Sequence, residues 1–142
     1  MSTMKPGYGK VNKEYGMVLA TTPPEDDGPV WMVNLMKYKE VAEYADGNSK
    51  GISGKEADDL YNPTSVLKSF GASVPFFGDV ILTPLGDGTK WDRVGVVRYP
   101  TRRSFIEMQY REDFRFNFFI IYFYLLPHMF QMVFIAKLLI KS

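Results

Sequence analysis

Strand-like and helix-like patterns alternate in one order along most of the chain, and this order limits the possible folds more than any other feature. The first strand pattern is mostly apolar on both of its alternating faces, as in a strand covered on both sides. The order is strand, helix, strand, strand, helix, which is the split βαβ arrangement without its last strand. The sequence therefore predicts an α+β fold of the ferredoxin-like kind. The segments are 30–38, 53–70, 73–85, 91–99 and 101–111.

Local signals mark where these segments begin and end. Ser53 and Glu56 have the spacing of a capping box, in which each side chain bonds the backbone amide of the other residue. Pro63 lacks an amide donor and is expected to kink that helix or to divide it in two, and Gly71 is a natural helix stop. The Gly-Asp-Gly run at 86–88 predicts a hairpin turn between the second and third strands.

The composition divides the chain into three parts: an arm at 1–27, a folded domain at 28–113 and an apolar segment at 114–142. The arm is polar and is expected to pack loosely, with one turn of helix at 15–20. The last part contains three basic and no acidic residues and holds seven of the eleven Phe residues. This change in composition indicates that the end of the chain has a different role from the domain.

Cysteine and histidine counts exclude several kinds of chemistry. The chain has no Cys and a single His, His128, so disulfides, thiolate metal sites and a cysteine nucleophile are excluded. A zinc site would need carboxylates almost alone, so we expect no metal and no cofactor. The formal net charge of +1 gives no reason to expect nucleic acid as a partner. The lack of Cys fits a reducing, cytoplasmic compartment.

Four runs of residues resemble the domain-of-unknown-function 1330 family. They are DDGPVWMVNLMKY at 26–38, SGKEA at 53–57, WDRV at 91–94 and RYPTRRSF at 98–105. The resemblance covers about 16–113.

The family belongs to the dimeric α/β-barrel superfamily, which includes cofactor-independent monooxygenases, lactone isomerases and haem-binding members. The resemblance implies a homodimer with the ferredoxin-like fold, and it implies no settled activity. Family members continue after the second helix into a polar segment and a last strand with small apolar residues. No match extends beyond Phe114, so we expect this chain to lack a normal fourth strand.

Four polar residues are candidates for a ligand site in the domain. Asn34 could orient a ligand carbonyl, and the alternative is a structural hydrogen bond, because a buried amide needs partners. Asp92 follows an indole and is the candidate catalytic base, with a structural role at the strand end as the alternative. Arg98 could hold a carboxylate, and the alternative is an ion pair with an acid such as Asp79. Tyr61 is placed near the same pocket.

Other polar and aromatic side chains support less specific predictions. Tyr38 and Tyr99 could line the pocket, although aromatic packing alone explains them. A solvated rim of the domain is expected from Lys37, Lys39, Arg102 and Arg103.

The apolar segment 116–140 is long enough to cross a membrane as a helix. At about 1.5 Å per residue it spans a hydrocarbon core of about 30 Å. Arg115 precedes it and Lys137 lies near its end, whereas His128 falls in its middle, where a polar side chain is costly in lipid. The sequence thus both favours and disfavours a membrane anchor.

Three interpretations of the C-terminal part remain open. It is a membrane anchor, a helix packed on the domain or across a dimer, or a non-native end such as shifted-frame or unspliced sequence. In each case we expect helix over most of 117–139, with a kink at Pro127.

Two classes of function follow. The first is a homodimeric binder of a small, anionic organic molecule, or an enzyme of monooxygenase-like or isomerase-like activity, working without cofactor. The second is a non-catalytic protein held at a membrane or partner by its C-terminal helix. The dimer is expected to form between sheets, because Met32, Met36, Val94 and Val96 make both faces of the sheet apolar.

Overall fold

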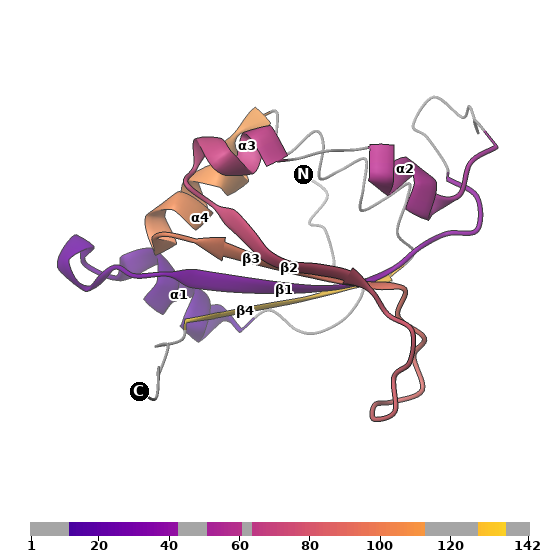
Figure 1. The fold of residues 1–142 in the computed structure, drawn as a ribbon. Coiled ribbons are helices and arrows are strands. Elements are labelled where there is room, and N and C mark those ends of the chain that lie inside the picture. The colour runs from indigo at the N-terminus through magenta and orange to yellow at the C-terminus, as the bar shows by residue number, and fades with distance from the viewer. Residues whose placement is uncertain (1–11, 43–50, 61–63, 113–127, 136–142) are drawn as a thin grey trace, which may run out of the picture.

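The computed structural model describes residues 12–42, 51–60, 64–112 and 128–135. They form a mixed α+β fold in which helices pack on an antiparallel sheet (Figure 1). In chain order the elements are α1 (Lys13–Thr21), the short 3-10 helix η1 (Pro24–Asp26), β1 (Val30–Lys37), α2 (Gly54–Leu60), α3 (Thr64–Ser69), β2 (Ser73–Asp79), β3 (Arg93–Tyr99), α4 (Arg102–Tyr110) and β4 (His128–Ile135).

The sheet has the order β2-β3-β1-β4, and each neighbouring pair is antiparallel. The last strand of the chain therefore lies beside the first, and the helix-connected strands β1 and β2 are separated by β3. This is the strand order of the split βαβ pattern.

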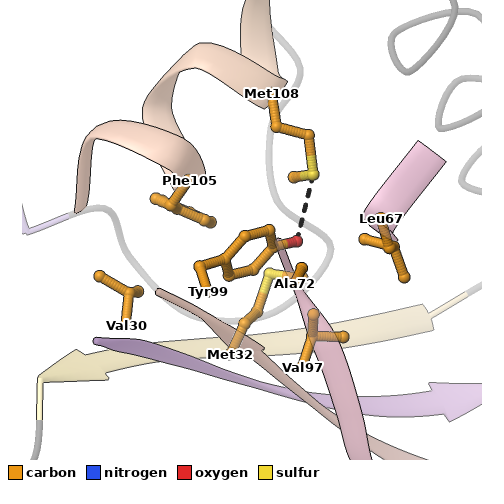
Figure 2. Packing of buried hydrophobic residues seen from close by; sticks show 8 residues of the cluster. All are labelled: Val30, Met32, Leu67, Ala72, Val97, Tyr99, Phe105 and Met108. Carbon is orange, nitrogen blue, oxygen red and sulfur yellow. Dashed lines mark hydrogen bonds between the residues drawn. The ribbon is translucent and has the colours of Figure 1, made fainter. Parts of the chain in front are cut away.

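The two faces of the sheet differ in burial. Residues of β3 alternate between buried and half-buried along the whole strand, and the buried positions face the helices. The core lies under α3 and α4, with Tyr99 at its centre (Figure 2). The Tyr99 hydroxyl donates to Met108 Sδ at 3.2 Å, and its ring meets Phe105 edge to face at 5.2 Å between centroids. The buried cluster comprises Val30, Met32, Leu67, Ala72, Val97, Tyr99, Phe105 and Met108.

The opposite face, here called the open face, has no buried residue on β1 or β3. Its side chains are half-buried, and the Arg98 guanidinium lies 5.7 Å from the centre of the Trp31 ring. Met32 and Met36 belong to the helix-facing side, whereas Val94 and Val96 belong to the open face. On β1 and β3 the open face consists of Trp31, Val33, Leu35, Lys37, Val94, Val96 and Arg98.

The local sequence signals are confirmed where the structure describes them. The Ser53 amide donates to Glu56 Oε2 at 2.7 Å, and the Glu56 amide donates to Ser53 Oγ at 3.1 Å, which is the predicted capping box. Helical structure around Pro63 is divided into α2 and α3, with 61–63 outside the described residues. Gly71 has φ of 68° and ends α3 as predicted. Thr101 caps α4 by accepting from the Ser104 amide at 3.0 Å.

The prediction of a C-terminal helix without a fourth strand is wrong for 128–135. These residues form β4, which pairs with β1 from Lys37 opposite His128 to Val30 opposite Ile135. A run rich in Phe, Met and Ile fits a strand as well as a helix, and pairing with β1 decides between them. The rest of 114–142 lies outside the described residues. Within the described part of the chain, no helix is long and apolar enough to span a membrane.

Two further expectations need correction. The connection between β2 and β3 is not a tight hairpin, because the strands end at Asp79 and begin at Arg93, with 80–92 between them. The single helical turn expected in the arm is instead the nine-residue helix α1, whose Leu19 packs against the core. Asn12 caps α1 by accepting from the Tyr15 amide at 3.0 Å.

Candidate functional site

The four predicted site residues do not come together in the structure. Asn34 is half-buried on the helix-facing side of β1, where it lies opposite Gly95 in the sheet. Arg98 lies on the open face, so the sheet separates the two side chains. Tyr61 lies outside the described residues.

Asp92 ties the ends of two strands together. Its carboxylate accepts from the Tyr38 amide at 2.7 Å, and its own amide donates to the Met36 carbonyl at 2.8 Å. Its carbonyl accepts from the Val80 amide at 2.9 Å. These contacts fit the structural alternative for Asp92, in which a strand-end carboxylate satisfies a backbone donor.

Among the described residues, Arg98 does not form the alternative ion pair with an acid such as Asp79. Asp79 instead pairs with Arg93 at 2.9 Å and with Lys55 at 2.7 Å. Asp92 and Arg98 are six positions apart in the chain, which at about 3.3 Å per strand residue places them roughly 20 Å apart. A joint role of these two residues on one ligand is therefore not supported.

A buried arginine that the sequence analysis passed over organises the most polar part of the domain. Arg93 is 5% exposed and lies at the start of β3, on the helix-facing side. Its Nε donates to Asp79 Oδ1 at 2.9 Å. Its Nη1 donates to Asp59 Oδ1 at 2.8 Å and to Asp58 Oδ2 at 3.1 Å. This arrangement, here called the Arg93 cluster, consists of Tyr38, Lys55, Asp58, Asp59, Phe77, Asp79 and Arg93.

Two aromatic rings contact the Arg93 guanidinium. Its central carbon lies 4.9 Å from the centre of the Phe77 ring and 5.5 Å from that of Tyr38. Close packing around Phe77 also explains a glycine in the neighbouring strand. A Cβ at Gly95 would lie 3.0 Å from Phe77 Cδ2, so a side chain there requires the Phe77 ring to move.

Burial and hydrogen bonding set the proton affinities in the Arg93 cluster. Burial raises the pKa of Asp58, and the hydrogen bond from the Tyr38 hydroxyl and the charge of Arg93 only partly offset it. Burial and that same hydrogen bond raise the pKa of Tyr38. Burial opposes the charge of Arg93, but bonds to Asp59 and Asp79 outweigh it and raise the pKa of Arg93. The pKa of Asp79 is lowered by hydrogen bonds from Lys55 and Arg93.

The Arg93 cluster mainly connects α2 to the sheet. Arg93 directs Nε and Nη1 at carboxylates of this chain, so it does not resemble a binding group for an external anion. The carboxylates outnumber the cations in the cluster, which also disfavours an anion there. The one reactive feature is the Tyr38–Asp58 pair, in which a half-buried carboxyl group holds a proton more readily than an exposed one.

A cleft of about 320 Å³ lies at the other end of the helix layer, between α1 and α4. Leu19 and Ile106 provide apolar walls that continue into the core. Its complete lining is Leu19, Ala20, Thr22, Pro24, Asp27, Arg102, Arg103, Ile106 and Glu107.

The charged groups of this cleft are all occupied except one. Asp27 accepts from the amides of Arg102 at 2.6 Å and Arg103 at 3.3 Å, at the start of α4. The Arg103 side chain pairs with Glu107 at 2.8 Å. Arg102 Nε is buried and has no hydrogen-bond partner in the part of the chain that the structure describes. The sequence analysis treated Arg102 as part of a solvated rim, and this interpretation is wrong for its Nε.

Metal-binding residues are not gathered in the described part of the chain. Ranges 12–42, 51–60, 64–112 and 128–135 contain no group of three His, Cys, Asp or Glu side chains placed to hold a metal ion.

Comparisons with known proteins support the fold and leave the activity open. No family model matches the chain, and no curated protein matches it. A solved structure of the protein RPA0582 from Rhodopseudomonas palustris, described as a protein of unknown function, is 21% identical. The match covers 92% of this chain and 96% of that one, with a TM-score of 0.70.

A structure of methylated RPA0582 is also similar to this chain. It is 22% identical, covers 94% of this chain and 97% of that one, and has a TM-score of 0.73. At these identities the similarity shows a shared fold alone, which is the small α+β fold described above.

Proposed function

We propose that the protein is a homodimer of the dimeric α/β-barrel type that binds a small organic anion, without a cofactor, in the cleft between α1 and α4. This proposal keeps the family resemblance of 16–113 and moves the ligand site away from Asn34, Asp92 and Arg98. The observation that carries it is the buried, unpartnered Nε of Arg102 in a cleft whose other charged groups are engaged.

The size of the cleft sets the size of the ligand. A volume of 320 Å³ lies at the lower end of the range for small-molecule sites. At roughly 30 Å³ for a group the size of water, it holds about ten non-hydrogen atoms. Leu19 and Ile106 favour an apolar body, and Arg102 favours one carboxylate at its end.

The charges around the cleft support an anion over a neutral ligand. A buried donor without an acceptor costs about 1–3 kcal/mol, and a ligand carboxylate would remove this cost. Asp27 accepts hydrogen bonds from α4 amides, and Glu107 pairs with Arg103. Neither acid is therefore an unpaired negative charge that would repel an anionic ligand.

The proposed activity is binding, with no chemical step. The cleft contains no unengaged base or nucleophile among the described residues, because Asp27 and Glu107 already accept hydrogen bonds. The Tyr38–Asp58 pair belongs to α2 and the end of β1, at the other end of the molecule (Figure 1).

The open face supports the homodimer. Apolar side chains on it are half-buried, and α2, α3 and α4 all lie on the other side of the sheet (Figure 1). An apolar sheet face of this size is typical of an interface, and a two-fold contact would bury the same face of both copies.

Binding of octanoate and of octanamide tests the ligand proposal. The two probes share an apolar chain and differ in charge, and each is titrated into the full-length protein by calorimetry. We expect octanoate to bind about 10-fold more tightly, because a charge-assisted hydrogen bond is worth about 1.5–3 kcal/mol and the site is partly solvated.

Substitution of Arg102 identifies the residue responsible. Arg102→Gln is expected to abolish the preference for octanoate, while Arg98→Gln, on the other side of the sheet, preserves it. Equal affinities of the two probes for the unmodified protein, or an unchanged preference in Arg102→Gln, would overturn the proposal.

A further inference from the structure

The connection between β2 and β3 exposes large apolar side chains that no described part of the chain covers. Ile81 is 99% exposed, Leu82 is 78% exposed and Leu85 is 88% exposed. The segment 80–92, here called the β2–β3 arm, extends from the side of the sheet opposite α2 and α3 (Figure 1). It therefore projects past the open face.

The ends of the β2–β3 arm are fixed to the sheet. The Val80 amide donates to the Asp92 carbonyl at 2.9 Å, and the Asp92 amide donates to the Met36 carbonyl at 2.8 Å. Near its tip the Thr89 amide donates to Asp87 Oδ1 at 2.9 Å. The three apolar side chains are thus presented by a segment with anchored ends.

The open face continues into this surface through β2. Phe76 pairs with Val96 in the sheet register and is 56% exposed. Val74, on the same edge strand, is 42% exposed. Apolar surface therefore extends from the centre of the open face, across the β2 edge, to the β2–β3 arm.

The area that a stable dimer requires points to a second copy of this chain as the partner. Four strands at about 4.8 Å spacing and seven or eight residues at about 3.3 Å give the open face a footprint of roughly 500 Å². A specific interface buries about 800 Å² on each partner. Because side chains project from the sheet, the accessible surface of the open face exceeds this flat footprint and approaches the size of a standard interface.

The β2–β3 arm supplies further apolar area next to the open face. Burial of one Leu or Ile side chain removes roughly 60–120 Å² of apolar surface from water, so Ile81, Leu82 and Leu85 add roughly 180–360 Å². Added to the open face, this area extends the apolar surface that one copy can bury against another. In a two-fold dimer the β2–β3 arm of each copy would bury its apolar side chains against the other copy.

We infer that the β2–β3 arm packs against the open face and β2 edge of a second copy of this chain, so that Ile81, Leu82 and Leu85 are buried in the dimer. This inference rests on the dimer of the proposed function and names a second element of its interface. It is independent of the ligand proposed for the α1–α4 cleft.

Sedimentation of loop variants tests the inference. The triple variant Ile81→Ser, Leu82→Ser and Leu85→Ser changes only exposed side chains, so the monomer fold is expected to persist. We expect its dimer dissociation constant to rise at least 100-fold. The matched control is Tyr15→Ser, Met17→Ser and Val18→Ser on α1, which also changes three exposed apolar side chains and is expected to leave the constant unchanged.

A second variant distinguishes the contribution of the β2–β3 arm to the dimer from that of the open face. Val96→Lys at the centre of the open face is expected to give a monomer. If Val96→Lys dissociates the dimer and the triple arm variant does not, the arm inference is wrong and the sheet dimer stands. If the unmodified protein is monomeric at tens of micromolar, both are wrong.

A cysteine label identifies what covers the arm. Because the chain has no Cys, Leu82→Cys provides a single site for a maleimide. Its labelling is expected to be slow in the dimer and to accelerate at least 10-fold on dilution below the dissociation constant. If protection from labelling does not change with protein concentration, residues of the same copy cover the β2–β3 arm. If the protein cosediments with phosphatidylcholine vesicles, the partner of the β2–β3 arm is lipid. Either result overturns the inference.

Discussion

Arg93→Met is the substitution that most directly tests the account of the Arg93 cluster. Methionine keeps much of the apolar volume and removes the charge and both hydrogen-bonding nitrogens that face the carboxylates. The side chain of Arg93 is 7% exposed, so the change affects a buried group. Breaking a buried ion pair by removing one partner costs about 3–5 kcal/mol.

The exposure of the three acids decides how much of that cost applies. Asp59 and Asp79 have side chains that are 55% and 51% exposed, so both return to water when Arg93 is removed. Asp58 is 12% exposed and is left as the uncompensated buried charge. Because Asp58 keeps the hydrogen bond from Tyr38, we expect a loss of about 2–4 kcal/mol, or roughly 6–12 °C in Tm.

The pH dependence of this loss is a sharper test than its size. Burial raises the pKa of Asp58 in the folded protein, so the folded state binds this proton more tightly than the unfolded state. Its contribution to stability is therefore largest at low pH and falls as the pH rises through the raised pKa. Arg93 lowers this pKa, so its removal raises the pKa of Asp58 further and adds about 1.4 kcal/mol of penalty at neutral pH for each unit of the rise.

Urea unfolding of both proteins at pH 4 and pH 7.5 measures the effect. The penalty of Arg93→Met is expected to be larger at pH 7.5, and Asp58→Asn in the Arg93→Met background is expected to recover part of it. Arg103→Met, at an exposed i,i+4 pair with Glu107, is the control and should show no measurable change. A penalty below about 0.5 kcal/mol, or one of equal size at both pH values, would refute the reasoning.

Three further substitutions test local features. Ser53→Ala removes the cap of α2 and is expected to cost about 1 kcal/mol in chemical unfolding; an unchanged midpoint would contradict the capping box. Gly95→Val is expected to lower the free energy of unfolding by about 1–3 kcal/mol, because the new side chain displaces the Phe77 ring. An unchanged near-UV circular dichroism spectrum of this variant would contradict the expected movement of Phe77. Tyr99→Phe is expected to change stability by less than about 1 kcal/mol, because its hydroxyl donates only to the weak acceptor Met108 Sδ; a calorimetric loss above 2 kcal/mol would refute this.

Features that depend on neighbouring residues could be predicted from the sequence. The Ser53–Glu56 capping box and the stop at Gly71 depend on contacts within a few residues, so the pattern carries the information. The order of strands and helices from 30 to 111 follows from the same kind of local pattern. These predictions are confirmed within the described ranges.

Features that depend on distant residues could not be predicted in the same way. The strand β4 forms beside β1, about 100 residues earlier in the chain, and its Phe-rich and Met-rich composition does not reveal that pairing. The Arg93 cluster combines α2, β2 and β3, which no spacing in the sequence brings together. One signal was available: Arg93 shares its strand face with Val97 and Tyr99, and an arginine on a core-facing position requires acidic partners.

The candidate site shows the same limit. Asp92 and Arg98 stood out because polar residues interrupt an apolar strand, but the structure assigns the first to backbone contacts and the second to the Trp31 ring. Arg102 did not stand out, because Arg102 and Arg103 are adjacent at the start of a helix and look equally solvated. Their difference arises from Asp27 and Glu107, which engage the α4 amides and Arg103.

The position of β4 at the end of the sheet has a consequence for synthesis of the protein on the ribosome. Val30 pairs with Ile135, so one edge of β1 has no partner until residue 135 has emerged. Until then the apolar strand β1 presents unpaired amides and carbonyls, which can pair with other nascent chains. Formation of the complete sheet also requires closure of a loop of about 100 residues, which is a slow type of contact to form. A ribosome that stalls between residues 111 and 128 would therefore release a chain with an open β1 edge, and such chains are expected to require a chaperone that binds extended apolar segments.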